Sequence, residues 1–90
     1  MTTFVARATA LFESDHAAFS AIYQKVEAIV NLLSLAQFRE VLGAASDFCY
    51  EEDETTTASS AIYRRLRQAA ERLNLTPFDL VCWFTEDWNY

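Results

Sequence analysis

The sequence predicts an all-α protein, a compact bundle of four or five short helices in one domain over residues 1–90. Gly43 and Pro77 are the only glycine and proline, so the chain lacks the frequent turn residues that β-hairpins need. Alanine, the strongest helix former, occurs fourteen times. Apolar residues recur at three- and four-residue steps, which is the spacing of one helical face. With 52% hydrophobic and 22% charged residues, the composition is that of a globular chain.

The first helix is predicted over residues 4–13, with Thr2 or Thr3 as its N-cap. Ser14 then has the features of a new N-cap, because Asp15 follows it at the first helical position, where a carboxylate suits the helix dipole. The second helix starts there, is predicted to run to residue 33, and has the clearest apolar stripe. That stripe is formed by Phe19, Ile22, Tyr23, Val26, Ile29, Val30 and Leu33.

The third helix is predicted to begin after Ser34, which forms a capping box with Gln37. Gly43 lies inside this helix and indicates either a close approach of another helix or a mild kink. Residues 51–57 follow as a loop, because four adjacent acidic residues repel one another and the three threonines are weak helix formers. The inward face of the third helix is predicted to hold Leu35, Phe38, Val41, Leu42, Ala45 and Phe48 or Cys49.

The fourth helix is predicted over residues 58–73 and stops at Asn74, a residue type that tolerates the left-handed conformation. A strong start signal follows at once. Thr76 is the N-cap, the single proline takes the first helical position, and Asp79 stands at the third. The fifth helix is predicted over residues 77–87. It is apolar on more than one face, so it is either the central helix of the bundle or a contact surface.

Length and composition exclude several classes of protein. No run of about 18 apolar residues exists, so we expect no membrane span. The N-terminus has no basic segment ahead of an apolar run, and two cysteines do not make a disulfide framework. These features predict a cytoplasmic protein with reduced thiols.

No constellation of side chains indicates catalysis or a cofactor. His16, Cys49 and Cys82 lie on three different segments, without the CxxC or HxxxH spacing of metal ligands. A single glycine also leaves no glycine-rich phosphate or oxyanion loop. Adjacent carboxylates on a helix point apart, and exposed acids lack the burial that tunes a catalytic pKa. We therefore expect no enzyme, no metal and no cofactor.

The charge pattern points to a protein partner. The net charge is −6, and acidic residues gather at 51–54 and again at 86–87. One interpretation is a solvated loop held by Arg64 and Arg65. The other is an acidic surface that docks on a basic protein and modulates or inhibits it. Mimicry of nucleic acid is one concrete form of such docking, and in size and charge the chain resembles small inhibitors from phages or mobile elements. The residues predicted to bind that partner are Glu51, Glu52, Asp53, Glu54, Trp83, Glu86, Asp87, Trp88 and Tyr90.

Two alternatives remain open at this point. Residues 66–84 resemble a helix-turn-helix unit, with the second helix in the place of a recognition helix. The predicted helix over residues 77–87 has no lysine, arginine or asparagine to read base edges, and its carboxylates would face phosphates. Nucleic-acid binding is therefore the weaker interpretation. Its phosphate contacts would be Arg64, Arg65, Arg67 and Arg72. The second alternative is a self-associating structural protein, a homodimer through the second helix or the C-terminal aromatic run.

Overall fold

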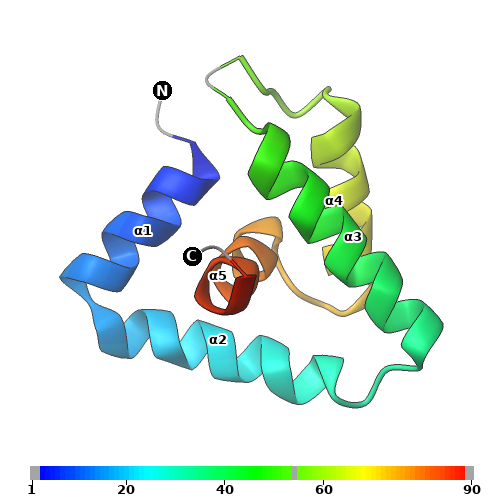
Figure 1. Cartoon of the computed structure of the whole chain (residues 1–90), viewed down its shortest axis with the longest axis horizontal. Helices are drawn as coiled ribbons and strands as arrows, with labels where there is room; N and C mark the ends of the chain where they lie inside the picture. The colour runs from blue at the N-terminus through cyan, green and yellow to red at the C-terminus, as the bar shows by residue number, and fades with distance from the viewer. Residues whose placement is uncertain (1–2, 54, 89–90) are drawn as a thin grey trace.

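The fold is an all-α bundle in which one helix is wrapped by the others. The computed structural model describes residues 3–53 and 55–88, with only the backbone of Trp88. Within these residues there are five helices and no strand: α1 (Phe4–Ser14), α2 (His16–Val30), α3 (Leu35–Glu51), α4 (Ala61–Arg72) and α5 (Pro77–Trp88). Figure 1 looks along α5, with α1, α2 and the α3–α4 pair placed around it. The predicted bundle is confirmed.

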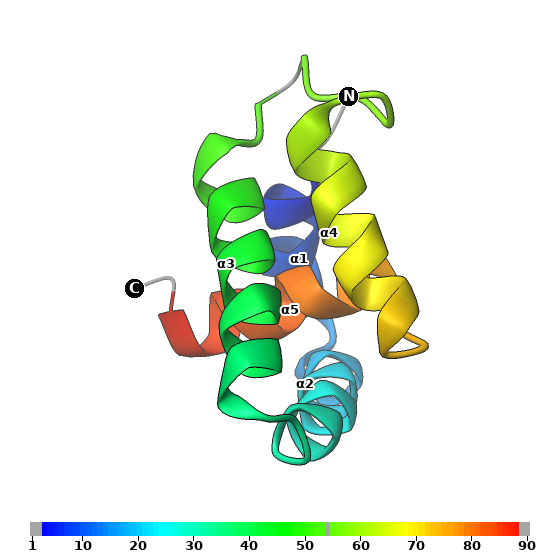
Figure 2. The same ribbon diagram turned by 90° about the vertical axis from the view of Figure 1, so that its right-hand side faces the viewer.

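The central position of α5 follows from its composition. Five consecutive side chains, residues 80–84, are each at most 2% exposed. Consecutive residues on a helix point in all directions, so this burial requires neighbours on every side. All four other helices contact α5, and Figure 2 shows it crossing behind the antiparallel pair α3 and α4. Burial of each large apolar side chain stabilises the fold by about 1.5–3 kcal/mol.

The predicted start signals of α3 and α5 are present. Ser34 and Gln37 form the reciprocal capping box of α3. At α5, the Thr76 Oγ1 accepts from the Asp79 N–H at 3.2 Å, and the Asp79 carboxylate accepts from the Thr76 N–H at 3.0 Å. Thr3 caps α1 by accepting from the N–H of Ala6. Local sequence therefore determines where these three helices begin.

The connection between α4 and α5 is a Schellman motif. Asn74 has φ 59°, as predicted for a left-handed stop. The Leu75 N–H donates to the carbonyl of Ala70 at 2.9 Å, and the Asn74 N–H donates to that of Glu71 at 3.0 Å. Leu75 is only 8% exposed, which supplies the apolar contact that accompanies this motif. The motif turns the chain so that α5 enters the core.

The structure corrects three of the predicted details. Asp15, not Ser14, caps α2: its backbone is not helical, and its Oδ1 accepts from the Ala18 N–H at 3.1 Å. Helix α2 ends at Val30 instead of residue 33, because the N–H groups of Leu32 and Leu33 donate to carbonyls three residues back, as in a turn, and not four residues back. Leu35, predicted to face inward, is 63% exposed at the first position of α3.

Helix α4 begins at Ala61, three residues later than predicted. The Ser60 Oγ accepts from the Thr57 N–H at 3.0 Å, and the Thr57 carbonyl accepts from the Ser60 N–H at 3.0 Å. These bonds form a turn that competes with helical pairing for the same backbone groups. The Ser and Thr residues that precede the helix therefore belong to the loop.

Candidate functional site

The acidic segment after α3 is partly built into the fold. The Glu52 carboxylate accepts hydrogen bonds from the N–H of Phe4 at 2.8 Å and from the N–H of Val5 at 3.1 Å. These are two of the unpaired donors at the first turn of α1, where the helix dipole also favours a negative charge. Glu52 is half-buried and holds the loop against α1. Its carboxylate has a structural role in the fold, and its role in partner binding stays a prediction.

Asp53 organises the loop that follows. Its Oδ1 accepts from the N–H of Thr55 at 2.8 Å and from the Thr55 hydroxyl. These hydrogen bonds, the side-chain one first, lower the pKa of the Asp53 carboxyl below its usual value. Its own N–H donates to Thr56 Oγ1 at 3.1 Å. Glu51 is exposed and has no hydrogen bond or ion pair within the described chain, whereas Glu54 lies outside the described residues.

A second group of carboxylates surrounds Tyr23 on α2. The Tyr23 hydroxyl donates to the two carboxylate oxygens of Asp87, at 3.0 and 2.8 Å. Burial, this hydrogen bond and the charges of Asp87, Glu27 and Glu86 together raise the pKa of Tyr23 to about 12. Three carboxylates from two helices therefore lie around one phenol. Asp87 is engaged there, while Glu86 has no hydrogen bond in the described chain.

Trp83 was predicted to contact a partner, and this is wrong. Its side chain is 1% exposed, and its Nε1–H donates to Glu27 Oε2 on α2 at 2.8 Å. A buried indole needs such an acceptor, and α2 supplies it. Of the other predicted aromatic contacts, the Trp88 side chain and Tyr90 lie outside the described residues.

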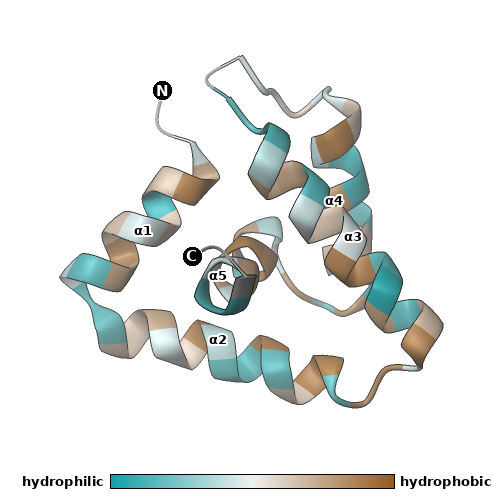
Figure 3. Ribbon diagram, in the orientation of Figure 1, coloured by the Kyte–Doolittle hydropathy of each residue, from teal (hydrophilic) through white to brown (hydrophobic). Residues whose placement is uncertain are grey.

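Tyr50 joins the two acidic segments and was not singled out from the sequence. It is 67% exposed, and its ring meets the edge of Phe84 at a centroid distance of 5.8 Å. The contact sets the last turn of α3 against the second half of α5, and Figure 3 colours the viewer-facing end of α5 as hydrophilic. We call Tyr50, Glu51 and Glu86 the acidic face. The signal available in the sequence was that Tyr50 directly precedes the acidic run.

The basic helix α4 is partly paired with the rest of the protein. Arg65 forms an ion pair with Asp47 on α3, not with the acidic loop, and Arg67 lies 3.7 Å from Glu71. Arg64 and Arg72 have no ion pair within residues 3–53 and 55–88. Residues 79–84 of the helix that follows, α5, are buried, so this part of α5 is not available to enter a DNA groove as a recognition helix.

The two cysteines lie in the interior between α3 and α5. Cys82 is fully buried and Cys49 is half-buried. Burial is the main cause that raises the pKa of each thiol to about 12, with smaller contributions from Glu52 and Cys82 at Cys49 and from Asp79 at Cys82. Among the described residues, no group of three or more His, Cys, Asp or Glu side chains is placed to hold a metal ion.

Comparison of the chain with protein-family models, curated proteins and solved structures finds no match. No helix in the described part of the chain is long and apolar enough to cross a membrane.

Proposed function

We propose that the protein binds a partner protein with a basic surface through the acidic face and so modulates or blocks that partner. The observation that carries the proposal is an exposed tyrosine, Tyr50, which directly precedes Glu51 and whose ring contacts Phe84, two residues before Glu86. Tyrosine is enriched among the residues that dominate binding energy, and surrounding charges steer association and select the partner.

The charge balance supports a basic partner. The chain carries thirteen acidic and seven basic residues, and neither Glu51 nor Glu86 has a cationic neighbour within 4 Å in the described chain. These carboxylates are hydrated in the free protein and available to a lysine- or arginine-rich surface. Occupation of a partner's nucleic-acid groove, with carboxylates in the places of phosphates, is one concrete form of such docking.

The structure determines which variants test the proposal. Reversal of the whole run 51–54 would also remove the Glu52 cap of α1, so loss of binding would be ambiguous. The double variant Glu51→Gln/Glu86→Gln leaves the cap and the Asp87–Tyr23 bond in place. The matched control is Glu13→Lys on α1, because both proteins then carry a net charge two units less negative than wild type.

The experiment is affinity capture by the tagged protein from an extract of its own cell, followed by mass spectrometry and by titration of the captured protein. We expect a single basic protein that salt releases, that Glu51→Gln/Glu86→Gln no longer retains, and that Glu13→Lys retains. A short DNA duplex added as competitor tests the mimicry form. Equal retention by both variants contradicts the proposal.

A further inference from the structure

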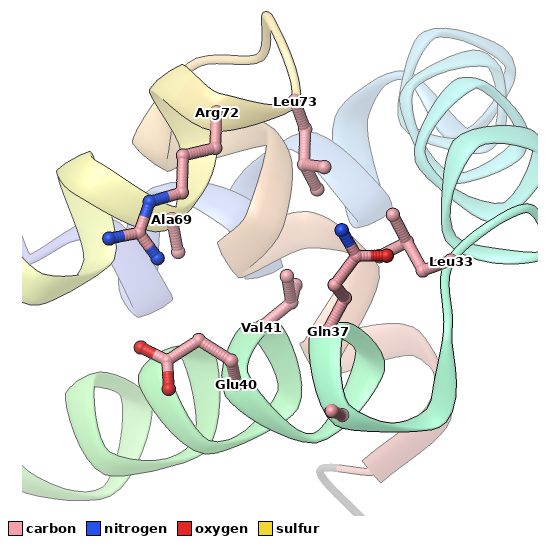
Figure 4. Close-up of a pocket in the computed structure, with 8 residues that line it drawn as sticks. Leu33, Gln37, Glu40, Val41, Ala69, Arg72 and Leu73 are labelled. Carbon is pink, nitrogen blue, oxygen red and sulfur yellow. The ribbon is translucent and has the colours of Figure 1, made fainter.

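A second surface, distinct from the acidic face, has the features of a binding site. A pocket of about 480 Å³ lies between the first half of α3 and the end of α4. In Figure 4, Glu40 of α3 and Arg72 of α4 lie on facing helices at one end of the pocket, with Val41 and Ala69 between the two helices. The remaining lining residues are Leu33, Ala36, Gln37 and Leu73.

The register of the two helices sets Glu40 opposite Arg72. Helices α3 and α4 are antiparallel, and Asp47 of α3 pairs with Arg65 of α4. Glu40 stands seven residues before Asp47, and Arg72 stands seven residues after Arg65. Seven residues are about two helical turns, so an acidic residue of α3 again stands opposite a basic residue of α4 two turns away. At the first of these two positions Arg65 and Asp47 form an ion pair, and the Arg65 side chain passes close to the backbone at Gly43.

At the second position, Glu40 and Arg72 form no ion pair with one another in the described chain. Neither Glu40 nor Arg72 makes a hydrogen bond or ion pair in the part of the chain that the structure describes. Both are exposed and lie on facing helices at one end of the pocket. A molecule that fills the pocket satisfies both charges only if it offers a cation to Glu40, an anion to Arg72 and an apolar group to the floor between them.

The distribution of charge indicates which molecule can approach this side. Helices α3 and α4 together hold five of the seven basic residues and four of the thirteen acidic residues. The rest of the chain holds two basic and nine acidic residues, so two copies repel one another on those sides. The α3–α4 side is nearly neutral, and two copies meet least repulsion there.

We propose that a second copy of this chain docks on the pocket across a twofold axis, so that Glu40 of each copy pairs with Arg72 of the other. Such an isologous contact needs a self-complementary patch, in which residue i meets residue j and j meets i. One carboxylate and one guanidinium on either side of an apolar floor meet that requirement. Leu32 and Leu35, 87% and 63% exposed, are each next in the sequence to a pocket-lining residue and supply apolar area to bury.

The test uses reciprocal charge reversals, Glu40→Arg and Arg72→Glu, measured by sedimentation over a range of concentrations. Wild type is expected to show a concentration-dependent mass rising from 10.3 kDa toward twice that value. Each single variant places like charges against one another twice and is expected to weaken association at least about tenfold. A mixture of the two variants is expected to associate like wild type, because both contacts then join opposite charges.

Control variants separate this contact from general charge effects. Glu13→Arg and Arg64→Glu make the same charge changes at exposed sites outside the pocket and are expected to leave the mass unchanged. Circular dichroism and thermal unfolding confirm that all four variants fold. A wild type that stays monomeric throughout overturns the proposal, as does a mixture that fails to associate. Association that survives in both single variants overturns it as well and moves the contact to another surface, such as α2.

Discussion

Glu52 caps α1 from 48 residues away, with its carboxylate 2.8 Å from the backbone nitrogen of Phe4. The ring of Phe4 in turn packs against Phe48, Tyr63 and Phe78, at centroid distances of 5.8, 6.0 and 6.1 Å. These rings belong to α3, α4 and α5. One carboxylate therefore holds in place the residue at which α1 meets three other helices, and the acidic loop contributes to the stability of the bundle.

Glu52→Ala is expected to lower the free energy of unfolding by about 1–2 kcal/mol, because it leaves two helix donors without their charged acceptor. The melting temperature is expected to fall by roughly 5–15 °C for a domain of this size. Glu51→Ala removes the neighbouring exposed carboxylate and is expected to change stability by less than about 0.5 kcal/mol. Thermal unfolding at neutral pH compares the two, and equal effects would contradict the cap.

Tyr23 predicts a loss of stability at alkaline pH. Its pKa is about 12 in the folded protein against the ordinary value of 10.0, so the folded state holds the phenolic proton more tightly than the unfolded state. The contribution is complete below pH 10 and is lost as the pH rises from about 10 to 12. Tyr23→Phe is therefore expected to be less stable than wild type at pH 9, with a difference that shrinks toward pH 12.

Two measurements check this prediction. Denaturant unfolding of both proteins across the alkaline range gives the difference directly, and the buried thiols cancel because both proteins contain them. Ultraviolet titration of the folded proteins is expected to lose the phenolate step near pH 12 in Tyr23→Phe. A stability difference that stays constant with pH would exclude the linkage.

Gly43 predicts a small gain in stability on substitution. A Cβ at this position would lie 2.9 Å from Nη2 of Arg65, the flexible end of that side chain. Alanine is the better helix former by about 1 kcal/mol, whereas the exposed Arg65–Asp47 pair is worth about 0–1 kcal/mol. Gly43→Ala is expected to raise the free energy of unfolding slightly, and by the full amount of about 1 kcal/mol in an Arg65→Ala background. Chemical denaturation of wild type, the two single variants and the double variant measures both changes in the free energy of unfolding. If Gly43→Ala clearly lowers stability in the Arg65→Ala background, backbone packing and not Arg65 requires glycine.

Cys49 and Cys82 are expected to react slowly with thiol reagents in the folded protein. A pKa of about 12 leaves both thiols protonated near neutral pH, and the thiolate is the reactive form. The rate is expected to be at least about a hundredfold below that of the unfolded chain. Cys82→Ala leaves Cys49 as the single thiol and tests it alone. Rapid reaction of that variant under native conditions would mean that Cys49 is not held in the interior.

The sequence predicts the features of this fold that depend on neighbouring residues. The capping box from Thr76 to Asp79 and the left-handed stop at Asn74 are local, and both are present in the structure. The predicted helix boundaries are less accurate than the predicted caps. At the end of α2 and the start of α4 the backbone groups can pair either in a helix or in a turn, and the structure shows turns.

Contacts between distant segments could not be predicted in the same way. The bond from Trp83 to Glu27 spans 56 positions, and the cap that Glu52 provides spans 48. Nothing near Glu52 in the sequence distinguishes it from Glu51, since only the packing of α1 against the end of α3 assigns them different roles. For this reason the acidic face includes Glu51 and not Glu52.

The position of α5 in the chain has a consequence for biosynthesis. The helix that all four others surround is the last of the five to leave the ribosome, so α1 to α4 are made before their common core exists. Until α5 emerges, the apolar side chains of α1 to α4 that pack on α5 stay uncovered. Transiently exposed apolar surface of this kind is bound by chaperones. Arrival of α5 then supplies the contacts with every earlier helix that complete the core.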